Sequence, residues 1–308
     1  MKFGLVGTGY WARVTHAAAL ASEPAAEFTA VWGRSADRAA AFGQEFGVKP
    51  YAARAEYADF LDHVDGVAFS VPPDVQAELA VLAAGAGRHL LLEKPVATSA
   101  AAAGRVVAEV DRAGVSSVVF FTARFNPAVR QWLAGVQAAQ VQAARFQGGW
   151  ARWFGSAFGQ GSPYASSPWR REKGALWDVG PHALSLLTAA LGPVTGVTAD
   201  AGAGDLVHLV LHHSSGATST ASLTLGAPER AAHTELSLWG PAGLSPMPRT
   251  DDDPVAAYRV ALRELVADAE AGRRSHPCDV RFGATVVDVL AEAEQQIAGR
   301  RARSAGSG

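Results

Sequence analysis

The sequence predicts a doubly wound parallel α/β sheet over residues 1–121, followed by an α+β domain with a large, mostly antiparallel open sheet over residues 122–308. Two observations support this prediction. In the first part, short apolar runs alternate with alanine-rich helical stretches, which is the order of βαβ units. In the second part, longer strands follow one another without helices between them, and their polar and apolar residues alternate.

The first part contains five expected strands and four expected helices. The strands cover residues 2–6, 28–32, 67–71, 90–92 and 117–121, and each is nearly all apolar, as in strands buried on both faces. The helices cover residues 10–22, 36–46, 74–85 and 99–113, and two of them end near Gly85 and Gly114.

The second part begins with a helix at Asn126-Pro127. Strands are expected at residues 141–150, 194–201, 206–213, 217–225 and 234–239. Two helices, at 254–271 and 280–298, complete the domain, and the tail from Arg300 is expected to fray. The Gly-, Ser- and Pro-rich segment from Gly155 to Pro168 is expected to be a mobile loop near a site.

Period-two alternation marks the faces of the second sheet. One face is apolar, with Val207, Leu209 and Leu211 on one strand. The opposite face is polar and flat, and it carries Thr218, Thr220, Ser222 and Thr224. A flat polar face can meet its symmetry mate, so we expect a homodimer or homotetramer that assembles through this sheet.

The composition is that of a globular protein with a small-molecule partner. The chain has 308 residues, 49% of them hydrophobic, and a formal net charge of -2, so a basic surface for nucleic acid or membrane is not expected. The single Cys278 cannot form an intramolecular disulfide, and no cysteine ligand set for a structural metal is present. The chain starts directly in a strand and has no apolar run long enough for a membrane span. We therefore expect a cytoplasmic protein.

A GxGxxA motif, Gly7-Thr8-Gly9-Tyr10-Trp11-Ala12, follows the first strand. The first glycine permits a tight turn, the second lets backbone N–H groups approach a pyrophosphate, and the small Ala12 lets the helix pack on the strand. The anion then lies at the helix N-terminus. This strand-turn-helix context predicts a dinucleotide-binding Rossmann domain, and a purely structural glycine turn is the alternative.

The end of the second expected strand reads Trp32-Gly33-Arg34-Ser35, with Arg38 one turn later. An acidic residue normally stands there when the adenosine ribose has a free 2'-hydroxyl. Arginine and serine suit a 2'-phosphate instead, because a guanidinium fork matches its charged oxygens. NADP(H) is therefore the expected cofactor. NAD(H) is the alternative if Arg34 and Arg38 are ordinary solvated charges.

Lys94 is one of only four lysines and stands in Glu93-Lys94-Pro95, at the carboxyl end of a buried strand. Ligands of open α/β sheets bind at such ends. Partial burial near a ligand makes an ammonium a plausible proton donor or acceptor, a role that arginine cannot take. A surface pair of Lys94 with Glu93 is the alternative.

Asp178 and His182 are four residues apart in Trp177-Asp178-Val179-Gly180-Pro181-His182, at an expected helix start. In a helix their side chains would share one face, where a carboxylate can orient an imidazole that acts as general acid or base. Taken alone, the pair is more often a helix cap and a core histidine.

Four motifs in this order resemble the glucose-fructose oxidoreductase and inositol dehydrogenase (Gfo/Idh/MocA) family. They are Gly7–Ala12, Glu93-Lys94-Pro95, Arg124-Phe125-Asn126-Pro127 and Gly174–His182. The resemblance implies that Lys94, Asp178 and His182 face the substrate beside the nicotinamide. His182 would be the leading acid or base, and Lys94 would polarise the reacting oxygen and contact the nicotinamide ribose.

Two departures from the family pattern are visible. Where relatives often carry T-P-N-x-x-H, this chain has Val71-Pro72-Pro73-Asp74-Val75-Gln76, and Gln76 is expected to bond a ribose hydroxyl instead. The usual triple glycine before the catalytic helix is reduced to Lys173-Gly174-Ala175. The expected cofactor contacts are completed by Ser70, Pro72, Gln76, Glu93 and Lys94.

Aromatic and cationic side chains form the expected substrate pocket, since aromatic faces beside hydrogen-bonding groups suit a sugar. The leading candidates are Arg124, Trp153, Trp169 and Arg170, and further candidates are Trp150, Arg152 and Lys173. A core role for each tryptophan is the alternative. No metal site is expected.

Together these residues predict an NADP(H)-dependent oxidoreductase that moves a hydride to or from a hydroxyl or carbonyl carbon of a sugar or polyol. Two other functions stay open at this point. One is a dinucleotide-binding regulator without catalysis, and the other is a glycosidase that oxidises and re-reduces its sugar with a tightly held cofactor.

Overall fold

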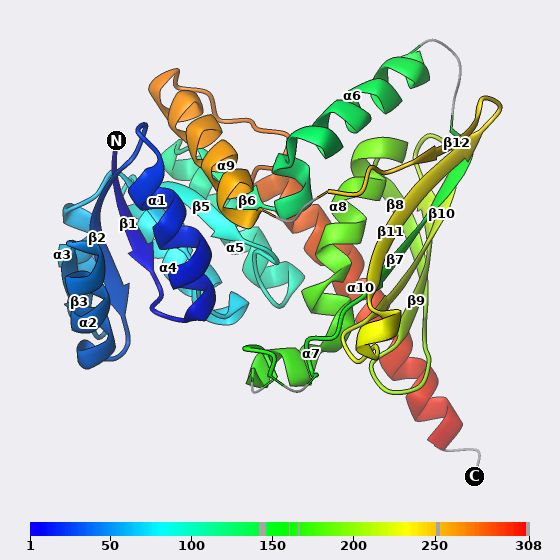
Figure 1. The fold of residues 1–308 in the computed structure, drawn as a ribbon, viewed down its shortest axis with the longest axis horizontal. Helices are drawn as coiled ribbons and strands as arrows, with labels where there is room; N and C mark the ends of the chain where they lie inside the picture. Colours follow the sequence, from blue (N-terminus) through cyan, green and yellow to red (C-terminus); the bar gives the residue numbers. More distant parts are fainter. Residues whose placement is uncertain (142–145, 160, 166, 251–252, 306–308) are drawn as a thin grey trace. The chain divides into compact units, whose positions relative to one another are not determined.

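A computed structural model of the chain describes residues 1–141, 146–159, 161–165, 167–250 and 253–305 (Figure 1). The chain divides into two compact units. The N-terminal unit comprises Met1–Phe125 and Asp252–Thr285, and the C-terminal unit comprises Asn126–Asp251 and Val286–Gly308.

The N-terminal unit contains a parallel six-stranded sheet in the order β3-β2-β1-β4-β5-β6. The order reverses between β1 and β4, which is the switch point of a doubly wound fold. Nearly every residue of β1, β4, β5 and β6 is buried, as their apolar sequences predict. The strands are β1 (Lys2–Val6), β2 (Glu27–Gly33), β3 (Lys49–Ala52), β4 (Gly66–Phe69), β5 (His89–Glu93) and β6 (Ser117–Phe120).

Helices connect these strands. Residues 10–22 are helical, with a π-helical stretch η1 (Ala12–Ala17) before α1 (Ala18–Ser22). Side-chain caps begin two of the later helices, at Ser35 and Ser99, and left-handed glycines end them. The later elements are α2 (Ala36–Phe46), α3 (Tyr57–Asp62), α4 (Pro73–Gly85), α5 (Ala100–Ala113) and η2 (Thr122–Phe125).

Two segments from late in the sequence complete the N-terminal unit. The helix α9 (Pro254–Glu270) packs along α1, and the first turns of α10 (Val280–Ala305) belong to the same unit (Figure 1). The expected boundary placed both helices entirely in the second domain. The helix α9 groups with the first unit because Arg263 bonds Glu23 at 2.6 Å and the ring of Tyr258 lies 4.3 Å from that of His16. The start of α10 does so because the Val280 N–H donates to the Ser117 hydroxyl at 3.2 Å.

The C-terminal unit contains a mixed six-stranded sheet in the order β12-β11-β7-β10-β9-β8. β7 and β10 pair in parallel, and all other neighbours are antiparallel. The strands are β7 (Gly148–Phe154), β8 (Val194–Ala201), β9 (Val207–His213), β10 (Thr218–Thr224), β11 (His233–Gly240) and β12 (Gly243–Pro246).

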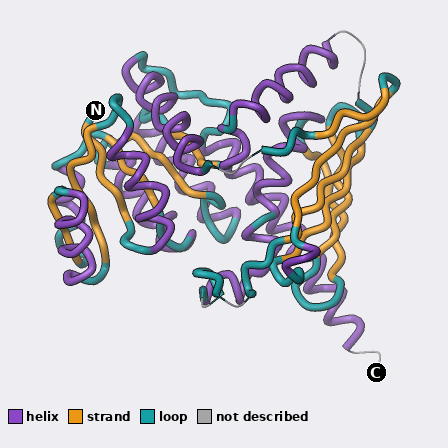
Figure 2. The backbone as a smooth tube through the Cα atoms, in the orientation of Figure 1, coloured by secondary structure: helices purple, strands orange, loops and turns teal. Residues whose placement is uncertain are grey.

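Helices pack on one face of this sheet (Figure 2). They are α7 (Pro168–Asp178), α8 (Gly180–Leu191) and the later part of α10, while α6 (Pro127–Val141) begins the unit as expected. Gln296 on α10 bonds the backbone of Ala199 and Val197 on β8. Val207, Leu209 and Leu211 are buried, whereas His208, Val210 and His212 are exposed, so the alternation predicted for β9 is confirmed.

Several expected boundaries in the C-terminal unit are wrong. The strand expected at 141–150 is instead the end of α6 at Val141 and the strand β7 from Gly148, with residues 142–145 outside the described part. The glycines begin the strand because the backbone is crowded there: a Cβ on Gly148 would lie 2.6 Å from the carbonyl oxygen of Thr218. The tail expected to fray from Arg300 is helical through Ala305, and Arg300 bonds Asp200 at 3.1 Å.

Other expectations stay open or lie partly outside the described residues. Between Gly155 and Ser167 the described residues form turns and irregular backbone without a regular helix or strand, residues 160 and 166 are not described, and the mobility of this segment stays a prediction. Among the described residues, no helix combines the length and apolar character needed to cross a bilayer. The same ranges contain no group of three or more His, Cys, Asp or Glu side chains that could hold a metal ion.

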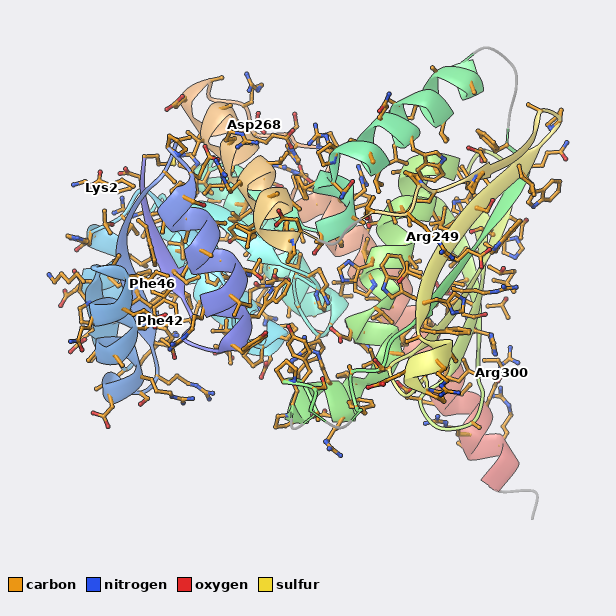
Figure 3. All side chains as sticks on the ribbon, in the orientation of Figure 1. Lys2, Phe42, Phe46, Arg249, Asp268 and Arg300 are labelled. Carbon is orange, nitrogen blue, oxygen red and sulfur yellow. The ribbon has the colours of Figure 1, made fainter. Side chains whose placement is uncertain are left out.

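Helices of this fold differ in how closely their surroundings pack, and two helical glycines show the difference. In α2, Phe42 and Phe46 lie one turn apart with ring centroids at 4.8 Å (Figure 3). In α10, a Cβ on Gly283 would lie 2.5 Å from Val96 Cγ2 and 2.9 Å from Val119 Cγ2. In α5, a Cβ on Gly104 would meet no atom within 4 Å.

This difference predicts opposite effects of the same substitution. Gly283→Ala should destabilise the protein by about 1–3 kcal/mol, because the added methyl overpacks a buried helix-sheet contact. Gly104→Ala should stabilise it by about 0.4–1 kcal/mol, since alanine has the better helix propensity and no neighbour is displaced. Urea unfolding followed by circular dichroism measures both, and a Gly283→Ala midpoint at or above that of Gly104→Ala would contradict the packing described.

Candidate cofactor and catalytic site

The glycine turn after β1 has the geometry that a dinucleotide-binding turn requires. Gly7 has a φ of +127°, and a Cβ there would lie 2.3 Å from the carbonyl oxygen of Ser70. Only glycine fits this approach. A Cβ on Gly9 would meet nothing within 4 Å, so the space above the start of the helix is open. The turn can therefore accept a pyrophosphate on its backbone N–H groups.

A pocket of about 400 Å³ lies at the carboxyl end of β2, next to this turn. Gly33 separates the two features, because a Cβ there would lie 2.9 Å from the Thr8 side chain. Trp32 and Arg34 line the pocket, and their contact with an adenosine stays a prediction. Ser35 caps α2 by accepting from the N–H of Arg38, and Arg38 is exposed and does not line the pocket. The complete lining is Trp32, Arg34, Ala53, Arg54, Val75, Glu78 and Leu79.

Arg54 in this pocket was not among the residues expected from the sequence. It follows Ala53, whose φ of +57° is the only positive value among the described non-glycine residues. A left-handed alanine costs roughly 1–3 kcal/mol and persists where neighbouring groups fix it. Here the Trp32 indole N–H donates to the Ala53 carbonyl at 2.9 Å, and the Ala53 N–H donates to the Gly33 carbonyl at 3.2 Å.

The side chain of Gln76 forms hydrogen bonds to the backbone of the Glu93-Lys94-Pro95 segment and the residue after it. Its side-chain oxygen accepts from the Glu93 N–H at 2.8 Å, and its amide nitrogen donates to the carbonyls of Glu93, Pro95 and Val96 at 2.8, 3.1 and 3.2 Å. The residue is fully buried. This role differs from the expected ribose contact, because the backbone already uses both the donor and the acceptor of the amide.

The carboxylate of Glu93 joins this segment to the helix after the glycine turn. One oxygen accepts from the Trp11 indole N–H at 2.8 Å and lies 2.9 Å from His16 Nε2, and the other accepts from the Lys94 N–H at 3.1 Å. One carboxylate oxygen of Glu93 thereby holds the Lys94 N–H while the other contacts Trp11 and His16. This position at the end of β5 was expected, and the contacts show what holds it.

The π-helical stretch explains how two residues of one helix reach the same oxygen. Trp11 and His16 are five positions apart, and the i→i+5 repeat of a π-helix brings such residues to one side. His16 is fully buried, packs against Tyr258 and was not anticipated from the sequence. Burial raises the pKa of Tyr258, and the nearby Glu93 charge adds to that effect.

The C-terminal unit places Asp178 and His182 about one helical turn apart. Asp178 ends α7 and His182 lies in the first turn of α8. Val179 between them keeps a helical φ and ψ, so the two side chains have the spacing of one helix face. The ring of His182 stacks on Trp153 with centroids 5.4 Å apart and planes at 11°. Trp153 therefore lies beside His182, and its substrate role stays a prediction.

Arg170 and Asp178 form the charged part of this cluster. The Arg170 Nε donates to the buried Asp178 carboxylate at 2.8 Å, and its guanidinium lies over the rings of Tyr164 and Trp169 at 4.5 and 4.9 Å. Gly174 adopts φ 62° and ψ -162° inside α7, a conformation reserved for glycine. The one glycine retained from the family's triplet thus makes the kink before Asp178.

Other substrate candidates lie elsewhere. Trp150 and Arg152 both bond Glu235 on β11, at 3.0 and 3.4 Å, on the sheet face opposite Trp153 because side chains alternate along β7. Lys173 bonds Glu294 on α10 at 3.1 Å. Arg124 belongs to the N-terminal unit, where its guanidinium lies 5.5 Å from the Phe282 ring centroid.

Comparison with known proteins agrees with this geometry. Residues 1–121 match the model described as "Oxidoreductase family, NAD-binding Rossmann fold", and residues 136–244 match the "GFO/IDH/MocA C-terminal domain". The chain belongs to the Gfo/Idh/MocA oxidoreductase family. The resemblance inferred from the four motifs is therefore confirmed, as is the predicted fold class.

Two relatives and one solved structure with sugar or anhydrosugar dehydrogenase names illustrate the similarity. D-apiose dehydrogenase of Paraburkholderia graminis is 34% identical over 231 residues, and the match covers 71% of this chain but 59% of that enzyme. D-xylose 1-dehydrogenase (NADP(+)) 2 of Haloferax volcanii is 29% identical over 270 residues, covering 83% of this chain and 79% of that enzyme. Levoglucosan dehydrogenase, solved with NADH and levoglucosan, shares the fold with a TM-score of 0.81 over 97% of both chains at 18% identity.

The buried Gln76 amide predicts a stability effect at the site. Gln76→Leu should lower the free energy of unfolding by about 2 kcal/mol or more, since it leaves several buried backbone groups without partners. Gln44→Leu, the same change at an exposed position of α2, is the matched control and should be nearly neutral. Urea denaturation compares the two variants, and equal midpoints would show that Gln76 does not hold the segment.

Proposed function

We propose that this protein is an NADP(H)-dependent oxidoreductase that transfers a hydride between the nicotinamide and a hydroxyl or carbonyl carbon of a sugar, polyol or related small molecule. One observation carries the proposal: the glycine turn follows β1 and Lys94 follows β5, at the same carboxyl edge of one parallel sheet. Ligands of doubly wound sheets bind at this edge. The open space above Gly9 and the arginine-lined pocket fit a dinucleotide.

Bound nicotinamide would supply or accept the hydride, and the chain's own residues would control the substrate oxygen. In the proposal the Lys94 ammonium polarises that oxygen, and the His182 imidazole takes or gives its proton. The stacked Trp153 limits rotation of the imidazole. Asp178, paired with Arg170, places a carboxylate about one turn from His182.

The relatives named for D-apiose and D-xylose support the proposed substrate class. Trp153 and Trp169 offer aromatic faces, and Arg170 offers hydrogen-bond donors, which together suit the C–H and O–H surfaces of a sugar. We propose that the activity is cytoplasmic, since a chain with one cysteine cannot form an intramolecular disulfide. Screening pentoses, hexoses, anhydrosugars and polyols for NADPH absorbance changes tests the proposal.

The proposed oligomer uses the face of the second sheet opposite its helices. That face carries the threonines of β10 and the exposed Val210, and Trp239 and Leu244 are exposed on β11 and β12. Light scattering at micromolar concentration should give a dimer or tetramer. Val210→Glu should shift it toward the monomer, whereas Leu82→Glu, at a similarly exposed residue of α4, should not. A monomeric wild type would contradict the proposal.

The cofactor prediction is that NADPH binds more tightly than NADH. Arg34 occupies the position where an acidic residue would select a free ribose hydroxyl. Fluorescence titration of both cofactors measures the preference, and Arg34→Ala should reduce NADPH affinity selectively. Equal affinities in the wild type would refute the prediction.

The catalytic prediction concerns His182, Lys94 and Asp178. His182→Ala and Lys94→Met should each lower turnover about 10²- to 10⁴-fold, the usual loss for a positioned acid-base group, with NADPH affinity nearly unchanged. Asp178→Asn should cost less if Asp178 only orients the imidazole. An ionisation in the wild-type pH profile should disappear in His182→Ala. Wild-type turnover in that variant would exclude His182 and leave Lys94 as the candidate.

A further inference from the structure

The turn between β3 and α3 carries Arg54, which lines the pocket at the carboxyl end of β2. Ala53 is held in the left-handed conformation by the Trp32 indole and the Gly33 carbonyl, and the Ala52 N–H donates to the Glu56 carboxylate at 2.6 Å. Both sides of Ala53 are therefore fixed, so the direction of the chain at Arg54 is fixed as well. Two of these contacts come from the end of β2, the strand that also leads to Arg34.

The charges of the pocket favour a doubly charged anion. Arg34 and Arg54 are its two cationic lining residues, and Glu78 is its one acidic lining residue. Over the described ranges, neither guanidinium has a carboxylate within the 4.0 Å of an ion pair. Arg34 and Arg54 are both exposed residues of the pocket lining. The pocket thus carries one net positive charge that no described ion pair neutralises.

We propose that Arg54 is a second specificity-determining residue, which binds the adenosine 2'-phosphate together with Arg34. This inference rests on the proposed NADP(H)-dependent function. A neutral ribose diol gains little from two guanidinium groups, whereas a phosphate monoester carries about -1.5 to -2 charges at pH 7 and three acceptor oxygens. Charge-assisted, forked hydrogen bonds from arginine match such a group.

The net charge makes both arginines necessary. With Arg34 and Arg54 present, the two cations exceed the Glu78 charge by one. Removing either arginine leaves a neutral pocket, which loses its net attraction for the phosphate. The two variants should therefore weaken binding of the 2'-phosphate to a similar extent. Apolar contacts from Trp32, Val75 and Leu79 do not depend on the phosphate, so NADH binding should change little.

Isothermal titration of the full chain with four probes tests the inference: NADPH, NADH, 2',5'-ADP and 5'-ADP. Arg54→Gln should weaken NADPH and 2',5'-ADP about 10- to 100-fold, the usual range for hydrogen bonds to a charged group, and change NADH and 5'-ADP less than about threefold. Arg54→Lys should recover part of the loss, because it restores the charge without the fork. Arg105→Gln on α5, at another exposed arginine, should leave all four affinities unchanged.

The outcomes separate this inference from the proposed function. If the wild type prefers NADPH and Arg54→Gln keeps that preference, the role of Arg54 is refuted while the NADP(H) dependence stands. If Arg54→Gln weakens all four probes equally, Arg54 stacks on the adenine instead, and the specificity role is again refuted. A wild type that binds neither dinucleotide overturns both.

Discussion

The hydrogen-bonded clamp on Glu93-Lys94-Pro95 is the constraint on which the proposed site depends. Gln76 bonds backbone groups of Glu93, Pro95 and Val96, and the Glu93 carboxylate connects the segment to Trp11 and His16. Since Trp11 and His16 belong to the helix that follows the glycine turn, one carboxylate links the turn expected to hold the pyrophosphate to the lysine expected to meet the substrate. A shift of either element would strain the other.

The parts of the fold that are buried on both faces could be predicted from the sequence. The strands β1, β2, β4, β5 and β6 are apolar runs, and their positions match the predictions to within two residues at each end. The strand β3 was missed because Lys49 and Pro50 are unusual in a strand, yet β3 is an edge strand, where both are tolerated. The predicted bounds of β7 were wrong because the strand begins with two glycines. Close backbone contacts require these glycines, but glycine is not typical of strand sequences.

Some residues of the candidate site could be predicted from short stretches of sequence, and others depend on contacts between distant parts of the chain. The glycine turn, Lys94 and the Asp178–His182 pair could be found because each forms a short motif. His16 and Arg54 could not be found in this way. His16 reaches Glu93 because of a π-helical repeat, and Arg54 follows an alanine in the left-handed conformation, and neither feature is visible in a short motif. Gln76 was found but assigned to the ribose, because its backbone partners are 17 to 20 residues away in sequence.

The chain returns to the N-terminal unit at α9, so this unit is not complete until late in translation. The helix α9 covers His16 and supplies Tyr258 and the arginines that bind Glu23, yet it is translated after every strand of the second sheet. On the ribosome the Rossmann sheet must therefore wait for about 130 further residues before its first helix is covered. A fragment that stops at Phe125 would lack α9 and would leave the side of that helix facing α9 uncovered.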